Sequence, residues 1–312
     1  YLDDDGYKVE PEYYWPVIPM ILVNGTKGVG TGYSTEVPCY NPAEIIKYLK
    51  KLLRNEEWEI PAMTPWYKGF KGTIRKVSEN SYETRGVWEK VSNGTVRITE
   101  LPIKTWTQDY KTFLDKLTDE GKIKNWIDNT TETLIDLTIK MDRFELDRWI
   151  NAGKVEKELK LFSKVNTSNI HLFNEKGKLK KYEGPEEILY KFYKCRKKLY
   201  TKRYNFLLKE LEGRVKKISA QVAFIKGIME NTIKVFRVPK KDVIGQLEYN
   251  NFPKWEKTYD YLTDMKIDNF TDEKIKQLEK QSSRLQVELG ELKKKTSVDL
   301  WKEDLEYLEK HL

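Results

Sequence analysis

The first half of the chain alternates apolar and polar residues over short stretches that are separated by turn residues. Residues 85–101 alternate in this way, and the Asn93-Gly94 pair among them predicts a hairpin turn. Residues 131–141 alternate as well, and residues 171–182 predict a second hairpin. The first half is therefore expected to be rich in short strands.

Helical segments lie between these strands. Residues 42–54 are expected to form a helix, with Asn41 as its N-cap and Pro42 at its first position. Two further helices are expected at 109–117 and at 142–161. Because strands and helices do not alternate regularly, the pattern predicts an α+β fold with a mixed sheet-and-helix domain.

The second half changes to a heptad pattern. Residues 186–229 contain no proline, and apolar residues recur there in alternating steps of four and three. A second segment further along repeats this spacing in steps of three and four. The seam positions are Leu211, Val215, Ile218, Val222, Ile225 and Met229 in the first segment and Ile275, Leu278, Ser282, Leu285, Leu289 and Leu292 in the second.

Two heptad helices joined by the irregular stretch 232–271 predict a long antiparallel coiled coil that carries a small helical head. The first helix is expected to be about 40–45 residues long, on the order of 65 Å. A last helix is expected to begin after Thr296 or Ser297.

A glycine-rich segment at 24–32 follows an apolar run at 17–23, with glycines at positions 25, 28, 30 and 32. This spacing is expected to exclude a stable helix or strand and to let the backbone approach another molecule closely. Val29 lies between Gly28 and Gly30, two residues after Lys27. An apolar side chain beside a cation on such a loop is a candidate wedge between stacked bases, although a purely structural turn explains the glycines equally well. The segment lacks the Gly-Lys-Ser/Thr ending of a phosphate-binding loop.

A second candidate follows the strand that ends near Leu101-Pro102. Lys104, Thr105, Trp106 and Thr107 place a cation, two hydroxyls and an aromatic ring on one turn, which suits contacts to phosphate, and the alternative is a simple helix cap. A basic run at the start of the long helix is interpreted as a solvated face, with contact to a nucleic-acid backbone as the alternative. Its members are Lys194, Arg196, Lys197, Lys198, Lys202 and Arg203.

The formal net charge of +8 permits an anionic partner without requiring one. Two cysteines and two histidines lie far apart, so no disulfide framework, zinc site or nucleophile–histidine pair is expected, and a reducing compartment is the default. No apolar run is long enough to span a membrane. The chain begins at Tyr1 without methionine, and we interpret it as part of a longer protein.

Several motifs along the chain closely resemble type IIA DNA topoisomerases of the eukaryotic and large-DNA-virus kind. The resemblance runs nearly end to end and rests on specific stretches. They are Val9-Glu10-Pro11-Glu12-Tyr13-Tyr14, Pro16-Val17-Ile18-Pro19-Met20-Ile21-Leu22-Val23-Asn24-Gly25, Gly28-Val29-Gly30-Thr31-Gly32, Trp66-Tyr67-Lys68-Gly69-Phe70-Lys71-Gly72-Thr73-Ile74, Ile98-Thr99-Glu100-Leu101-Pro102 and Gly177-Lys178-Leu179-Lys180-Lys181-Tyr182.

The resemblance implies residue roles in DNA binding. The position of Val29 holds an isoleucine in that family, which wedges between base pairs and bends the DNA, and Lys27, Gly28 and Gly30 flank it. The position of Lys104 is commonly arginine, and lysine keeps the charge but loses bidentate contact with phosphate. Thr105, Trp106 and Thr107 are expected to contact DNA beside it.

The resemblance also implies a domain plan. Residues 1–18 would end a winged-helix domain or its linker, 19–183 would form the tower domain of the DNA gate, and 184–312 would form a coiled coil. The head at about 232–271 would make the dimer contact of the lower gate, the C-gate.

The implied function is the DNA-bending and dimerising part of an ATP-dependent topoisomerase that passes one duplex through a break in another. The catalytic tyrosine, the Mg²⁺ site and the ATPase would lie in upstream domains, so this chain is expected to hold no cofactor and not to cleave DNA alone. The expected partners are double-stranded DNA, a second copy of the chain and those upstream domains, with no membrane. The nucleus, or a viral factory in the host cytoplasm, is the expected location. The alternative is a non-enzymatic architectural DNA-binding protein with a dimerising stalk.

Overall fold

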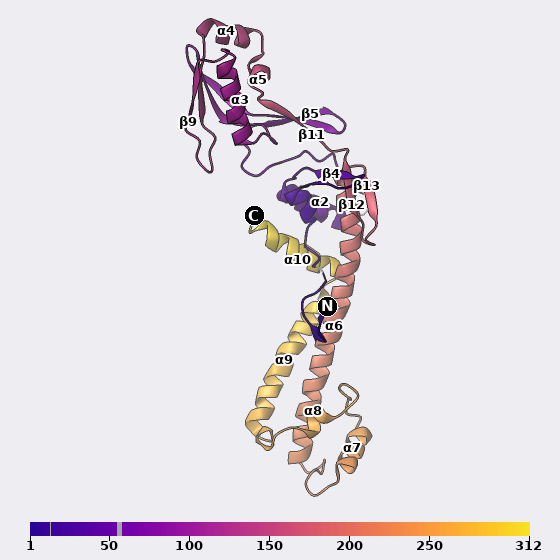
Figure 1. Cartoon of the computed structure of the whole chain (residues 1–312). Coiled ribbons are helices and arrows are strands. Elements are labelled where there is room, and N and C mark those ends of the chain that lie inside the picture. Colours follow the sequence, from indigo (N-terminus) through magenta and orange to yellow (C-terminus); the bar gives the residue numbers. More distant parts are fainter. Residues whose placement is uncertain (13, 55–57) are drawn as a thin grey trace. The chain divides into compact units, whose positions relative to one another are not determined.

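The computed structural model describes residues 1–12, 14–54 and 58–312 (Figure 1). Contacts divide the chain into two compact units, one formed by 1–195 with 305–312 and the other by 196–304. Both helices and short strands are present, so the predicted α+β fold is confirmed. The domain limits at 18/19 and 183/184, drawn from the family resemblance, stay predictions.

The main core of the first unit is built on a four-stranded antiparallel sheet in the order β7-β8-β10-β9. This core contains Ile98, Leu114, Ile139 and Trp149, from two strands and two helices. The strands are β7 (Val87–Ser92), β8 (Thr95–Glu100), β9 (Asn125–Asp128) and β10 (Leu137–Lys140), and the helices packed on them are α3 (Thr107–Asp119), α4 (Arg143–Asn151) and α5 (Val155–Glu158).

The predicted hairpin turn at Asn93-Gly94 is confirmed between β7 and β8. Gly94 has φ +79°, and a Cβ there would lie 2.5 Å from the Met141 carbonyl oxygen, so both the backbone angle and the available space favour glycine.

The helix predicted over 142–161 is wrong as one element. The chain forms α4 and α5 instead, because Gly153 adopts φ +61° between them and ends the first helix. The start at Asp142 holds, since its carboxylate accepts hydrogen bonds from the Phe144 and Glu145 backbone nitrogens.

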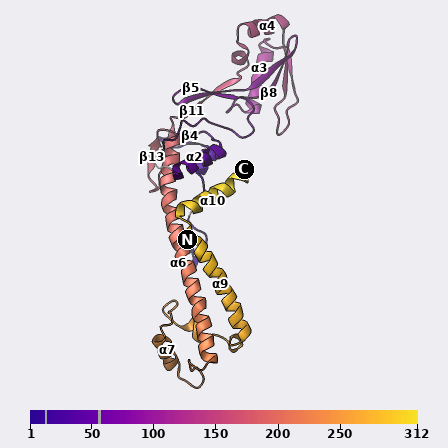
Figure 2. The same ribbon diagram turned by 180° about the vertical axis from the view of Figure 1, so that it is seen from behind.

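The remaining strands of the first unit form small antiparallel sheets (Figure 2). The hairpin predicted at 171–182 is confirmed as β12 with β13. The bounds are β1 (Asp3–Asp4), β2 (Tyr7–Lys8), β3 (Thr26–Val29), β4 (Ser34–Val37), β5 (Thr73–Ser78), β6 (Ser81–Arg85), β11 (Phe162–Asn166), β12 (Ile170–Phe173) and β13 (Leu179–Tyr182), with helices α1 (Met20–Asn24) and α2 (Pro42–Arg54).

Helix α2 has the predicted bounds, and Asn41 caps it by accepting a hydrogen bond from the Ala43 nitrogen at 2.9 Å. The glycine-rich segment departs from its prediction, because residues 26–29 form strand β3 and pair with β4. Glycine at positions 25, 28 and 30 therefore tolerates a strand here, where a paired partner strand supplies the hydrogen bonds that stabilise the extended backbone.

The second unit is an antiparallel helical pair with a small head, as predicted. Helix α6 (Pro185–Met229) is 45 residues long, and α9 (Asp272–Lys294) runs beside its later part (Figures 1 and 2). Lys226 pairs with Glu279 at 2.7 Å, while Glu212, further back on α6, pairs with Lys293 at 2.8 Å, further along α9. This crossed order shows that the helices are antiparallel.

The predicted seam forms the core between these helices, where Ile218, Ile225, Ile275, Leu278 and Leu285 are buried together. Met229 is an exception among the seam positions, because it is the last residue of α6 and 44% of its surface is exposed.

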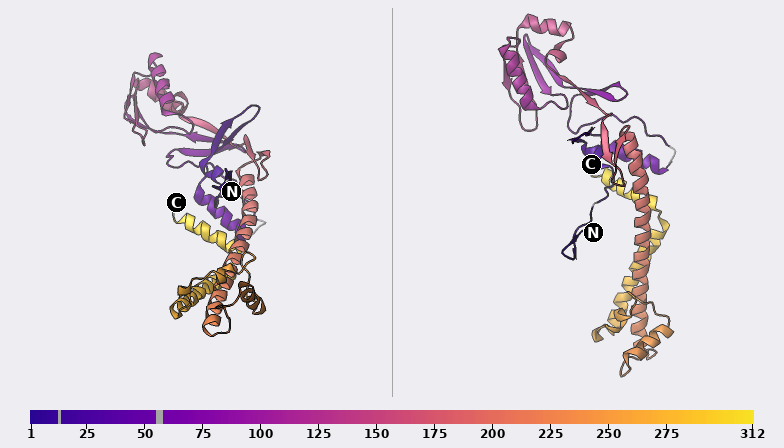
Figure 3. Two further views of the ribbon diagram at one scale, coloured as in Figure 1. Left: turned by 60° about the horizontal axis from the view of Figure 1, so that its bottom comes forward. Right: turned by 45° about the vertical axis from the view of Figure 1, so that its right-hand side comes forward.

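The head contains α7 (Lys240–Tyr249), α8 (Asp260–Thr263) and the short 3₁₀ helix η1 (Ile267–Asn269) around their own apolar core (Figure 3). Helix α10 (Ser297–Glu309) begins where the sequence predicts. Within the second unit, Trp301 of α10 stacks on Tyr200 of α6 with ring centroids 5.2 Å apart.

Candidate nucleic-acid interface

The β3–β4 hairpin presents Val29 to solvent at its tip. Val29 is the last residue of β3, opposite Ser34, and the Gly30 nitrogen donates a hydrogen bond to the Tyr33 carbonyl oxygen at 2.8 Å to close the turn. Gly32 in this turn has φ +84°, which glycine adopts without strain. Val29 is 85% exposed, so its apolar side chain gains nothing from the folded core.

The register of the hairpin places Val29 and Lys27 on the same face. Side chains two apart on a strand point to one side, and directly opposed residues share that side. Lys27 lies opposite Glu36, and Val29 lies opposite Ser34. The exposed valine and a cation therefore project together, as the wedge hypothesis requires.

Lys104 joins this face from a distant part of the chain. Its ammonium group forms an ion pair with the Glu36 carboxylate, and its backbone adopts φ +70°, a left-handed conformation uncommon outside glycine. Lys27, Val29 and Lys104, predicted separately from two sequence segments, thus lie around one hairpin.

Thr105, Trp106 and Thr107 form the start of α3. Trp106 is the N-cap residue, it makes no side-chain capping hydrogen bond, and its side chain is 75% exposed, while Thr107 is the first helical residue. The alternative of a simple side-chain cap by Trp106 is therefore not met. The positive end of a 13-residue helix begins directly after Lys104's turn, which favours negative charge there.

Lys157 and Lys160 extend this basic turn, and the sequence analysis missed both. They line a cavity of about 450 Å³ together with Lys104, Thr105 and Trp106, and Asp109 also borders it. The Lys160 ammonium lies 4.3 Å from the centre of the Phe113 ring. Only the packing of the chain around α5 brings these lysines beside residue 104, so no local motif could have identified them.

A buttress holds the hairpin from behind. The Glu36 nitrogen donates to the Asn169 carbonyl oxygen at 2.8 Å, and the Asn169 side-chain amide donates to Ser34 Oγ at 2.8 Å. The His171 nitrogen donates to Thr35 Oγ1 at 3.1 Å. Residues just before and within β12 therefore fix the strand that faces Val29, and the sequence analysis missed them as well.

The base of the hairpin is tightly packed. A Cβ on Gly25 would lie 2.7 Å from the Val37 carbonyl oxygen, so glycine is required at that position. Burial raises the pKa of the nearby Cys39 thiol, whose sulfur donates to the Asn24 carbonyl oxygen at 3.2 Å. Burial, with smaller contributions from Cys39 and Glu36, raises the pKa of Tyr67 far above its usual range. These neutral, buried groups support the hairpin and leave the charges on its outer face.

The basic run on α6 is partly engaged in structural contacts. In the second unit, Arg203 pairs with Asp304 at 2.7 Å, and the Arg196 guanidinium lies 4.5 Å from the centre of the Tyr200 ring. Burial lowers the pKa of Arg196. At these two positions the solvated-face interpretation is incomplete, because both side chains pack on or pair with neighbours.

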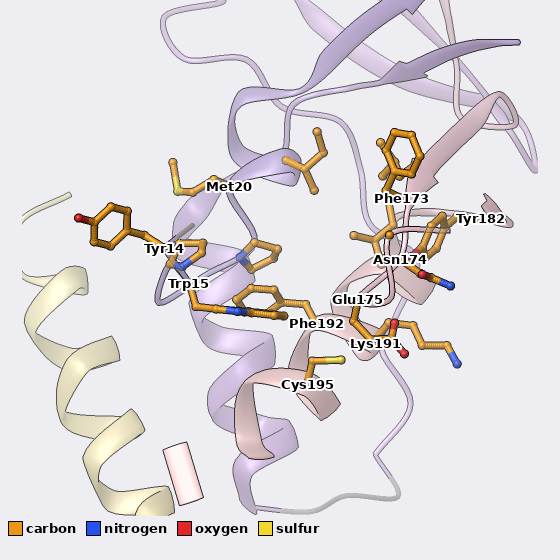
Figure 4. Close-up of a pocket in the computed structure, with 16 residues that line it drawn as sticks. Tyr14, Trp15, Met20, Phe173, Asn174, Glu175, Tyr182, Lys191, Phe192 and Cys195 are labelled. Carbon is orange, nitrogen blue, oxygen red and sulfur yellow. The ribbon is translucent and has the colours of Figure 1, made fainter. Parts of the chain in front are cut away.

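A further cavity of about 510 Å³ lies in the first unit (Figure 4). Trp15 and Phe192 lie together on one side of it with ring centroids 6.3 Å apart, and Phe173 and Tyr182 lie on the other side. Cys195 also lines it. Its lining is typical of a hydrophobic pocket and brings together no nucleophile with a histidine.

Among residues 1–12, 14–54 and 58–312, no group of three or more histidine, cysteine or acidic side chains is arranged to hold a metal ion. The acidic segment at the start of the chain forms a turn, in which Asp3 accepts a hydrogen bond from the Gly6 nitrogen at 3.0 Å. None of the helices described is long and apolar enough to cross a lipid bilayer.

Comparison with known proteins places these features in a family. The family model for DNA gyrase/topoisomerase IV matches residues 1–306. DNA topoisomerase 2 of Plasmodium falciparum is 38% identical over 99% of the chain and 24% of the relative, and that of Acanthamoeba polyphaga mimivirus is 33% identical over 97% of the chain and 29% of the relative. The chain thus spans about a quarter of the length of these curated relatives.

A solved structure is similar as well. It is the crystal structure of the Plasmodium falciparum topoisomerase II DNA-binding, cleavage and re-ligation domain, with a TM-score of 0.83 and 38% identity over 100% of this chain and 47% of that one.

Proposed function

We infer the function of this chain from its family, since it belongs to the DNA gyrase/topoisomerase IV family of type IIA topoisomerases, as its motifs indicate. We propose that it is the part of such an enzyme that grips and bends the duplex to be cut and that contributes a dimer contact. The whole enzyme would cut that duplex, pass a second one through the break and reseal it.

One observation carries the proposal: Val29, an apolar side chain that is 85% exposed, shares a hairpin face with Lys27 and lies near Lys104. Inserting an apolar side chain between base pairs unstacks them and kinks the duplex, at a cost of about a few kcal/mol. Cations that contact phosphates on either side of the kink offset that cost. Gly28 and Gly30 beside the wedge let the backbone approach the groove closely.

Trp106, Thr105 and Thr107 are proposed to contact the sugar–phosphate backbone with Lys104. The exposed start of α3 supplies backbone N–H groups and a positive dipole end for a phosphate. Valine in place of the family's isoleucine is expected to insert less far, and lysine in place of arginine to hold phosphate without bidentate geometry.

The head of the second unit is proposed to contact a second copy of the chain. Phe236 and Ile267 are 74% and 81% exposed there, and both border a cavity of about 360 Å³. Exposed apolar side chains around a hollow are typical of an association surface.

Mg²⁺ and ATP are proposed to act in the whole enzyme. The described residues of this chain offer no fitting group of ligands for Mg²⁺, and we derive no step through either cofactor. The residues here hold, bend and release DNA.

The test compares the chain alone with the chain joined to the upstream part of the protein. The proposal expects the chain alone to bind duplex DNA with strong dependence on salt and to leave supercoiled plasmid unrelaxed, while the longer protein relaxes it with ATP and Mg²⁺. If the longer protein binds DNA and never relaxes it, the architectural DNA-binding alternative replaces this proposal. DNA binding that is negligible at every salt concentration would remove both.

A further inference from the structure

Glu36 places a negative charge in the middle of the proposed DNA-binding face. It lies opposite Lys27 in the hairpin register, and its carboxylate forms the ion pair with Lys104. A carboxylate among cations that are meant for phosphate opposes binding, because DNA brings its own negative charges to the same place.

The geometry keeps this carboxylate in position. The Glu36 nitrogen is fixed to the Asn169 carbonyl oxygen at 2.8 Å, so β4 does not swing away when a ligand arrives. The side chains of Glu36 and Lys104 remain 28% and 34% exposed, which leaves the ion pair open to exchange with an incoming anion. Partly exposed ion pairs of this kind contribute little net stability and exchange easily.

We propose that Glu36 is an internal competitor for Lys104, which holds this lysine beside Val29 in the DNA-free protein and yields it to a backbone phosphate when duplex DNA docks. This inference rests on the proposed function. After the exchange, the Glu36 carboxylate is left close to the DNA backbone, where repulsion weakens the complex. Glu36 thus limits affinity and favours release, and a neutral residue there holds DNA more tightly.

The test is Glu36→Gln, which keeps the shape of the side chain and removes its charge. The full chain is titrated with a short fluorescent duplex at several salt concentrations. We expect Glu36→Gln to bind about three- to tenfold more tightly than the parent at low salt, with slower dissociation. Circular dichroism checks that the variant is folded.

Two comparisons make the result specific. Glu248→Gln removes the same charge from an exposed ion pair with Lys254 in the head, 2.9 Å between its atoms, and is expected to leave the affinity unchanged. In a Lys104→Gln background, Glu36→Gln is expected to gain less than about twofold, because the competition acts through Lys104.

Equal or weaker binding by Glu36→Gln, or the same gain in Glu248→Gln or in the Lys104→Gln background, overturns the inference and leaves the proposed function standing. Failure of the parent chain to bind duplex DNA at all overturns the proposed function, and this inference with it.

Discussion

Val29 and Ser34 are directly opposed as the last pair of the β3–β4 ladder, and the turn that follows them holds no bulky apolar side chain other than Tyr33. The valine therefore projects from a hydrogen-bonded strand end rather than from a loose loop. A rigid support matters for a wedge, since a side chain that yields on contact does not unstack base pairs. The hairpin, its cations and the helical unit each give an expectation that can be measured.

The salt dependence of DNA binding should report the two cations near Val29. Lys104→Gln and Lys27→Gln are each expected to reduce the slope of log K against log salt by about 0.9, the value for one phosphate contact. The measurement is fluorescence anisotropy of a labelled duplex across a salt series. Lys254→Gln in the head is the control, and an unchanged slope in either hairpin-face variant would remove that lysine from the DNA contact.

The seam between α6 and α9 should dominate the stability of the second unit. Ile225 is fully buried, so Ile225→Ala is expected to cost about 2–4 kcal/mol of the free energy of unfolding. Met229→Ala, on the same helix but 44% exposed, is expected to cost less than about 1 kcal/mol. Urea unfolding followed by circular dichroism compares the two, and similar losses would contradict the packing described for the seam.

The proposed dimer contact should be sensitive to charge in the head. Ile267→Asp places a carboxylate on an 81% exposed apolar position and is expected to shift sedimentation from dimer toward monomer without unfolding the chain. Val287→Asp, at a 61% exposed position on α9, is the matched control and should sediment as the parent does. An unchanged dimer in Ile267→Asp would assign the contact elsewhere.

Acid should weaken the four-stranded sheet through Asp136. Arg97 donates two hydrogen bonds to its carboxylate, at 2.8 and 2.9 Å, and this holds the pKa of Asp136 below its ordinary value of 3.8. A carboxyl with a lowered folded-state pKa stabilises the fold at pH above its ordinary pKa, and that stability is lost as the pH falls through the folded value.

We therefore expect Asp136→Asn to lose up to about 1 kcal/mol at pH 7 and to differ progressively less from the parent below about pH 4. Thermal unfolding across pH measures this, with Arg97→Lys as a variant that keeps the charge and loses the paired geometry. A constant difference between parent and Asp136→Asn from about pH 7 to about pH 2 would contradict the assignment.

Much of this fold could be predicted from local patterns. The heptad spacing identified the long helix and its antiparallel partner because one apolar seam determines both their length and their pairing. Asn93-Gly94 and Asn41-Pro42 are short-range signals that tertiary packing does not override here. Gly153 was a local signal of the break between α4 and α5, and the apolar pattern around it outweighed that signal in the prediction.

The site was predicted only in part. Val29 and Lys27 lie on one strand, so their spacing already placed them together once the strand is known. The pairing of Lys104 with Glu36, the buttress from Asn169 and His171, and the placement of Lys157 and Lys160 depend on segments far apart in the chain. Such contacts arise from packing, and no spacing within a segment reveals them.

The bend that the chain imposes on a short duplex tests the central claim most directly. Energy transfer between dyes at the two ends of the duplex should rise when the parent chain binds, and more for Val29→Ile, whose longer side chain inserts further. Val29→Ala should bind DNA with a similar salt slope and bend it less, since Val29 is 85% exposed and its loss leaves the fold intact. The same energy transfer for Val29→Ala and the parent, at saturating protein, would contradict the wedge.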